Sequence, residues 1–116
     1  EINNEIVEVA RQVKAKGFLT CICSNNFETR IRELNNKFDF LKEFDVQIFS
    51  YQVGVMKPDK GIFEALINAT NVKPHEIVYS DDSSDKLKGA DELGINTFVF
   101  SDVKGFIEKL KSFSVL

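Results

Sequence analysis

The sequence predicts an α/β fold in which a doubly wound parallel sheet is covered by helices on both faces. Short apolar runs of strand type alternate with stretches of helical periodicity along the 116 residues. The runs are almost entirely apolar, which is typical of strands buried on both faces of a parallel sheet. Alternation at this spacing indicates right-handed crossovers and three layers. We therefore expect residues 1–116 to form a single domain.

The elements are expected in the order helix, strand, helix, strand, helix, strand, helix, strand, helix. A stripe of apolar residues followed by Gly17 predicts the first helix, over residues 5–16. The four predicted strands are residues 18–23, 46–49, 77–80 and 97–100. The remaining helices are predicted over residues 27–37, from Lys57 to about Ala69 with Pro58 in the first turn, around Leu87–Leu93 with Gly94 as the stop, and after a cap at Ser101 or Asp102. Residues 50–56 are expected to form a loop.

Composition and charge exclude several classes of function. Hydrophobic residues make up 43% of the chain, which is enough for a packed core, and the net charge of -3 comes without any basic run. Nucleic-acid and membrane-surface roles are therefore not expected. Cys21 and Cys23 are too close along one strand for a disulfide with each other and do not fit a four-ligand zinc site. We interpret both as reduced core residues of a cytoplasmic protein.

Polar residues follow three of the predicted strands, and in a parallel sheet these strand ends meet at one edge, where ligands bind. Ser24 and Asn25 follow the first strand, Lys57 lies in the loop after the second, and Asp81 and Asp82 follow the third. Hydroxyl, amide and ammonium groups can hold phosphoryl oxygens. Two adjacent carboxylates repel each other unless a cation such as Mg²⁺ lies between them, and their oxygens suit that ion.

Each of these residues also has a purely structural interpretation. Ser24 and Asn25 could form a turn and a helix cap, Lys57 could be a solvated surface residue, and the two aspartates could cap the next helix. The functional interpretation is favoured because the three groups occur together at successive strand ends. His75 precedes the third strand, at the opposite edge of the sheet, and is interpreted as a surface residue.

These motifs resemble the core domain of the haloacid dehalogenase-like (HAD) hydrolases, over nearly the whole chain. Residues 21–25, Cys-Ile-Cys-Ser-Asn, resemble the second motif of the family, and residues 53–59, with Lys before Pro, resemble the third. Residues 77–94 resemble the fourth motif, in which a strand, an acidic pair and a short turn precede a helix containing Gly-Ala. The pattern is most similar to the subgroup with a small helical cap, which includes sugar-phosphate phosphatases, 2-haloacid dehalogenases and the phosphatase domain of soluble epoxide hydrolases.

The resemblance implies a Mg²⁺-dependent phosphatase of small phosphorylated metabolites that acts through an aspartyl-phosphate. Ser24 and Asn25 would bind the phosphoryl group, and Lys57 would bridge that group and the nucleophile. Asp82 matches the metal-binding aspartate of the family, with Asp81 as its acidic neighbour. Lys57 and Asp82 are thus the expected catalytic residues, and Asp82 and Asp81 the expected Mg²⁺ ligands.

The chain departs from the family pattern at two points. A second acidic or Asn position of the fourth motif falls on Lys86, for which Asp85 is a candidate substitute. The first motif, a strand ending in Asp-x-Asp that supplies the nucleophile, has no counterpart, and neither does the cap. In the family that strand lies between the strands predicted here at residues 18–23 and 77–80. We therefore expect an open slot, a fragment-like core and no activity from this chain alone, unless self-association or a partner segment fills the slot.

Two other functions compete with the phosphatase hypothesis. A 2-haloacid dehalogenase would share the fold, the Ser and the Lys but needs no metal, and the Asp81–Asp82 pair disfavours it. A non-catalytic HAD-like or receiver-like binding module is consistent with the missing nucleophile.

Overall fold

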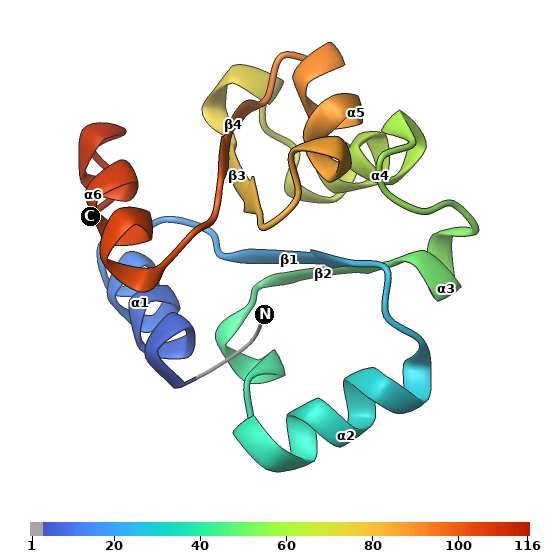
Figure 1. Cartoon of the computed structure of the whole chain (residues 1–116), viewed down its shortest axis with the longest axis horizontal. Helices are drawn as coiled ribbons and strands as arrows, with labels where there is room; N and C mark the ends of the chain where they lie inside the picture. Colours follow the sequence, from blue (N-terminus) through green and yellow to red (C-terminus); the bar gives the residue numbers. More distant parts are fainter. Residues whose placement is uncertain (1–3) are drawn as a thin grey trace.

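A computed structural model describes residues 4–116, apart from the side chain of residue 38. The strands are β1 (Cys21–Ser24), β2 (Val46–Phe49), β3 (Val78–Asp81) and β4 (Asn96–Val99). The helices are α1 (Asn4–Ala15), α2 (Glu28–Phe38), α3 (Ser50–Val53), α4 (Lys60–Thr70), α5 (Lys88–Glu92) and α6 (Val103–Ser112). Single turns of 3₁₀ helix are η1 (Leu41–Glu43), η2 (Pro74–Glu76) and η3 (Ser84–Leu87). The predicted alternation of helices and strands is confirmed (Figure 1).

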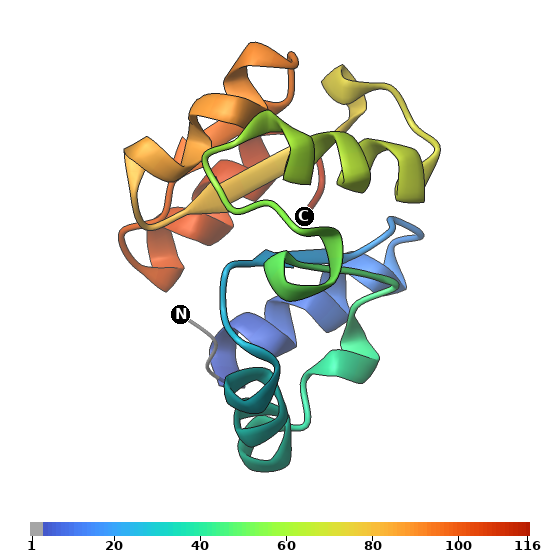
Figure 2. The same ribbon diagram turned by 90° about the vertical axis from the view of Figure 1, so that its right-hand side faces the viewer.

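The strands form two separate parallel pairs within the described part of the chain. β1 pairs with β2 from Cys21↔Val46 to Ser24↔Phe49, and β3 pairs with β4 from Val78↔Asn96 to Asp81↔Val99. No backbone ladder joins β1 to β3 among residues 4–116. This separation agrees with the slot expected between the first and third predicted strands. Figure 2 shows the two pairs as neighbouring parts of one body, with β3 and β4 above β1 and β2.

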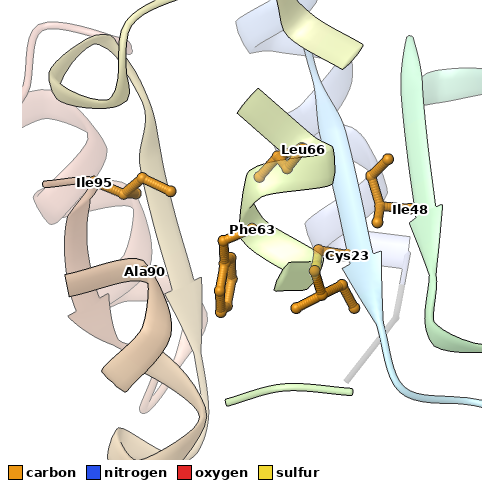
Figure 3. Packing of buried hydrophobic residues seen from close by; sticks show 7 residues of the cluster. Cys23, Ile48, Phe63, Leu66, Ala90 and Ile95 are labelled. Carbon is orange, nitrogen blue, oxygen red and sulfur yellow. The ribbon is translucent and has the colours of Figure 1, made fainter. Parts of the chain in front are cut away.

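Two buried clusters pack the helices against the strands, and the first of them joins the two strand pairs. The first cluster combines α4 and α5 with both pairs and consists of Cys23, Ile48, Ile62, Phe63, Leu66, Ala90 and Ile95. In Figure 3, Phe63 and Leu66 of α4 lie between Cys23 and Ile48 on one side and Ala90 and Ile95 on the other. The second cluster combines α1 and α6 with β4 and consists of Val9, Val13, Phe98 and Leu110. Helices therefore cover both faces, as expected for a three-layer α/β fold.

The first strand begins later than the sequence pattern predicts. Phe18 and Leu19 were expected in a buried strand, but they are 44% and 54% exposed and precede β1. The chain turns at Gly17, which has φ +94°, and is then anchored at Thr20, whose amide donates to Asp45 Oδ2 at 3.0 Å. This anchor fixes where the chain enters the sheet. Phe18 and Leu19 lie before it and are therefore not part of the strand, although both are apolar.

Three other boundaries differ from the prediction in detail. Residues 50–56 were expected to form a loop, but they open with the one-turn helix α3, which ends at Gly54 with φ +82°. Pro58 precedes α4 instead of lying in its first turn, because Asp59 is the N-cap and accepts the Gly61 amide at 2.7 Å. The helix expected to end at Gly94 is divided into η3 and α5. Of the two predicted caps of the last helix, Asp102 has that role and accepts the Gly105 amide at 2.6 Å.

Candidate functional site

A cavity of about 510 Å³ lies between the two strand pairs, and all five predicted site residues line it. β1 lines it from one side and β3 from the other. Ser24 and Asn25 come from the end of β1, Lys57 from the loop before α4, and Asp81 and Asp82 from the end of β3. The structure therefore brings together residues that lie up to 58 positions apart in the sequence, counted from Ser24 to Asp82.

Lys57 is buried and ion-paired, which rules out its interpretation as a solvated surface residue. Its side chain is 10% exposed, and its Nζ lies 2.5 Å from Oδ2 of Asp81, whose side chain is 9% exposed. The same ammonium donates to the hydroxyl of Tyr79 at 3.0 Å and to the carbonyl of Cys23 at 3.2 Å. A charged pair buried to this degree is stable only when further hydrogen bonds satisfy it, as they do here.

Asn25 fixes the backbone of Lys57 from both sides. The Lys57 amide donates to Asn25 Oδ1 at 2.8 Å, and Asn25 Nδ2 donates to the Lys57 carbonyl at 3.2 Å. Asn25 is not a helix cap, because the N-cap of α2 is Phe27, without a side-chain bond. Ser24 Oγ accepts the Asn26 amide at 3.1 Å, so the turn interpretation holds for Ser24, and its O–H remains a donor toward the cavity.

The two aspartates have different environments. Asp81 is bonded by Lys57 and also accepts the Ser83 amide on Oδ1 at 3.1 Å. Burial raises the pKa of the Asp81 carboxyl, but the hydrogen bond and charge of Lys57 outweigh this effect and hold that pKa below its usual value. Asp82 is exposed at the cavity. Asp81 is thus committed to Lys57, and Asp82 is the carboxylate turned to solvent.

The two aspartates could supply only part of the coordination shell of a Mg²⁺ ion. No group of three or more His, Cys, Asp and Glu side chains suited to a metal occurs among residues 4–116. Mg²⁺ keeps several waters and takes one or two carboxylates together with phosphate oxygens, so Asp82 and Asp81 supply the kind of hard oxygen ligand that this ion needs. Their assignment as Mg²⁺ ligands remains a prediction.

Asp85 is not among the residues that line the cavity, so the structure gives no support to it as the substitute for the acidic residue expected at position 86. Its carboxylate pairs with Lys88 at 3.3 Å, and these side chains are 80% and 69% exposed. Lys86 itself lines the cavity. A second cation, Arg30 of α2, also lines it, and was not singled out from the sequence. With Lys57, the cavity lining carries three cationic side chains against the two carboxylates Asp81 and Asp82, and this excess of positive charge favours an anionic ligand.

Tyr79 is a second functional-site residue, after Arg30, that sequence reasoning missed. It was assigned only to a strand, yet its hydroxyl donates to the Cys23 carbonyl at 3.1 Å and accepts from Lys57. Burial raises the pKa of the Tyr79 phenol well above its usual value, so the hydroxyl stays protonated. The available signal was a tyrosine within an apolar strand, because a buried hydroxyl needs a hydrogen-bond partner.

The structure agrees with the sequence interpretation of the two cysteines as free thiols and of His75 as a surface residue. Cys21 and Cys23 are free thiols on β1, and burial raises the pKa of each to about 11. His75 is exposed in η2, before β3. Among the helices described, none has the length and apolar character needed to cross a membrane.

Comparisons with known proteins agree with this geometry. The sequence model of the haloacid dehalogenase-like hydrolases matches residues 1–94. Bifunctional epoxide hydrolase 2 of Rattus norvegicus is 32% identical over 120 residues, which cover 95% of this chain and 21% of that protein. The phosphorylated carbohydrates phosphatase of Thermotoga maritima is 29% identical over 93 residues, covering 80% of this chain and 43% of the phosphatase. The chain thus spans about a fifth of the length of the epoxide hydrolase and less than half of the phosphatase.

Solved structures share the fold. An uncharacterized protein from Corynebacterium glutamicum superposes with a TM-score of 0.75 at 25% identity, covering 98% of this chain and 87% of that one. A HAD-family enzyme from Bacteroides thetaiotaomicron, solved with magnesium and inorganic phosphate, gives a TM-score of 0.77 at 22% identity over 86% of this chain and 53% of the enzyme. Together with the family match over residues 1–94, these findings show that the chain belongs to the haloacid dehalogenase-like hydrolases.

Proposed function

We propose that this chain supplies the phosphate-binding wall, and part of the Mg²⁺ site, of a phosphatase that acts on small phosphorylated metabolites. The reaction would proceed through an aspartyl-phosphate whose nucleophilic Asp lies on a segment outside this chain. The observation that carries the proposal is the buried Lys57 ammonium, held on Asp81 in a cavity that Ser24 and Asp82 also line.

The residues present match what phosphoryl transfer requires of a protein, which is mainly positioning and the stabilisation of negative charge. Lys57 and the O–H of Ser24 are donors for phosphoryl oxygens, and Asn25 keeps Lys57 in place through two backbone bonds. Asp82, with Asp81 beside it, would hold the Mg²⁺. When bound, this ion neutralises phosphate charge and orients the substrate.

Two backbone edges on either side of the cavity support a missing central segment. The Val46 amide donates to the Thr20 carbonyl at 3.2 Å, and in a parallel ladder the peptide groups of alternate residues then face the partner. The peptide groups of Cys21 and Cys23 therefore point away from β2, toward the cavity. The same reasoning applies to β3. Because the Asn96 amide donates to the Ile77 carbonyl at 3.0 Å, the peptide groups of Val78 and Ser80 point away from β4.

An extended segment inserted in parallel between β1 and β3 could pair with the peptide groups of Cys21, Val78 and Ser80. The Cys23 carbonyl already has side-chain donors, Lys57 and Tyr79. We propose that the nucleophile enters the site on such a segment, from the parent polypeptide or from a partner chain. The expected inactivity of this chain by itself follows from that proposal.

Two of the relatives are named for phosphatase chemistry, which supports the proposal. One is named a phosphorylated carbohydrates phosphatase, and another, from Bacteroides thetaiotaomicron, is named a D-ribitol-5-phosphate phosphatase and is 36% identical over 76 residues. A metal-independent dehalogenase would gain nothing from the second carboxylate, Asp82. Release of halide from a 2-haloacid without added metal would favour that alternative.

The direct test is the binding of inorganic phosphate by this chain, measured by calorimetry with Mg²⁺ and with a chelator. We expect binding that is stronger with Mg²⁺, weakened by Lys57→Gln, and made insensitive to Mg²⁺ by Asp82→Asn. Lys104→Gln and Asp85→Asn are matched controls, since both residues are exposed and lie away from the cavity lining. Circular dichroism distinguishes lost binding from lost folding in the Lys57 variant.

Two results would contradict the proposal. One is the absence of phosphate binding with or without Mg²⁺ in a folded chain. The other is metal-dependent hydrolysis of small phosphate monoesters by this chain alone, because the nucleophile would then lie within it. Phosphate binding without turnover in the parent-length protein would instead identify a non-catalytic binding module.

A further inference from the structure

The Lys57 ammonium has no N–H group left for a substrate in this structure. An ammonium has three donors, and the three acceptors around Nζ are Asp81 Oδ2 at 2.5 Å, Tyr79 Oη at 3.0 Å and the Cys23 carbonyl at 3.2 Å. A phosphoryl oxygen can therefore be bonded by Lys57 only if one of these acceptors gives up its bond.

The Cys23 carbonyl is the acceptor best suited to give way. The bond to Asp81 is charge-assisted and the shortest of the three, so it is the strongest. The bond to the Cys23 carbonyl is the longest and joins the ammonium to a neutral group. That carbonyl also accepts the O–H of Tyr79 at 3.1 Å, so it keeps a partner after Lys57 has left.

Tyr79 is held firmly enough to perform this role. Its ring packs edge-to-face against Phe63 of α4, with centroids 5.2 Å apart, and Phe63 is fully buried in the main cluster. Its hydroxyl uses both of its capacities at once, since it donates to the Cys23 carbonyl and accepts from Lys57. The hydroxyl thus links β1, β3 and the Lys57 loop at the level where the two strand pairs are not joined by backbone bonds.

We propose that Tyr79 is a positioning residue for Lys57. Its hydroxyl holds the ammonium beside Asp81 and keeps the Cys23 carbonyl hydrogen-bonded when one Lys57 N–H turns to a phosphoryl oxygen. Without the hydroxyl, that turn leaves a buried carbonyl without a partner, and an unpaired buried acceptor is costly. The part of the proposal that concerns the Cys23 carbonyl during phosphate binding rests on the function proposed above. The contact between Tyr79 and Lys57 can be tested without any ligand.

The test variant is Tyr79→Phe, which removes the hydroxyl and keeps the ring against Phe63. Tyr51→Phe is the matched control, because Tyr51 is the other of the chain's two tyrosines and stacks on Phe49 with centroids 5.6 Å apart. The first measurement is the proton exchange rate of the Lys57 ammonium by ¹⁵N NMR in the ligand-free chain, with the signal assigned by its loss in Lys57→Gln.

We expect the Lys57 ammonium protons to exchange about tenfold faster in Tyr79→Phe, because one of their acceptors is gone, and to be unchanged in Tyr51→Phe. A purely structural role for the hydroxyl would not alter this exchange in a folded variant. Equal exchange rates in the wild type and Tyr79→Phe would overturn the proposal, whatever the chain does with phosphate.

The second measurement is a double-mutant cycle on the affinity for inorganic phosphate. Tyr79→Phe is expected to weaken phosphate binding about tenfold in the wild-type background and to have no further effect in the Lys57→Gln background. An equal loss in both backgrounds would show that the hydroxyl acts independently of Lys57 and would overturn the proposal. If the wild type binds no phosphate, the proposed function fails, while the ammonium exchange rates still decide whether Tyr79 positions Lys57.

Discussion

Gly89 is expected to be the position at which a single added methyl group disturbs the site most. A Cβ atom at Gly89 in α5 would lie 2.2 Å from the carbonyl oxygen of Pro58 and 2.9 Å from both N and Cα of Lys60. All three are backbone atoms, which cannot rotate out of the way as the end of a side chain can. The start of α4, and with it Lys57 three residues before the first residue of that helix, would therefore have to move relative to α5.

The size of the effect follows from two opposing contributions. Moving the Pro58 carbonyl from 2.2 Å to the 3.4 Å of ordinary contact requires a shift of about 1.2 Å, which places the overpacking cost near the upper end of its usual range, about 3 kcal/mol. Alanine gains about 1 kcal/mol over glycine in a helix interior. We expect Gly89→Ala to lower the free energy of unfolding by about 2 kcal/mol.

Urea unfolding followed by circular dichroism measures this difference, and Gly105→Ala in α6 is the matched control. A Cβ at Gly105 would meet only the Asp102 side chain, at 3.0 Å, and the small shift this needs is offset by the gain of about 1 kcal/mol of alanine over glycine in a helix, so that variant should be near neutral. The Asn25 side-chain amide signals should shift in Gly89→Ala, because Asn25 bonds the backbone of Lys57. A Gly89→Ala chain as stable as Gly105→Ala, with unchanged Asn25 signals, would refute the close approach of α5 to Pro58.

Three further outcomes are expected. Burial raises the pKa of Asp81, but the larger effect of Lys57 leaves that pKa below the ordinary carboxyl value of 3.8. The stabilisation by this pair is therefore fully present above pH 3.8 and is lost as the pH falls through the lowered folded pKa. Asp81→Asn should remove this part of the acid dependence of urea unfolding, and an unchanged profile would contradict it. Burial raises the pKa of the Cys21 and Cys23 thiols to about 11 from 9.0, so iodoacetamide at pH 8 should alkylate the folded chain about a hundredfold more slowly than the urea-unfolded chain, and comparable rates by mass spectrometry would count against this burial. Asp102→Ala should cost about 1 kcal/mol in urea unfolding through loss of the α6 cap, whereas Ser101→Ala should cost little; the reverse order would mean that Ser101 is the cap.

Local rules were sufficient where a single short-range interaction decides the structure. Asp102 caps α6 through a bond to the amide three residues ahead, and Gly94 follows α5 in the positive-φ region that glycine tolerates. The same rules placed the polar residues at strand ends, because the apolar runs that form the strands are clear in the sequence. Phe18 was misplaced because its apolar character was counted and the anchor at Thr20, which depends on distant Asp45, was not visible.

The sequence by itself determined the order of helices and strands, the parallel character of the sheet and the five polar residues that share one cavity. Only the tertiary structure decided what each of those residues does there. It buried Lys57 on Asp81, left Asp82 exposed, turned Asp85 to the surface and placed the Tyr79 hydroxyl on both Lys57 and the Cys23 carbonyl. The physical reason is range: caps and apolar periodicity act over a few neighbouring residues, whereas the partner of a buried charge comes from whichever segment the packing of α4 and the two strand pairs brings within about 3 Å.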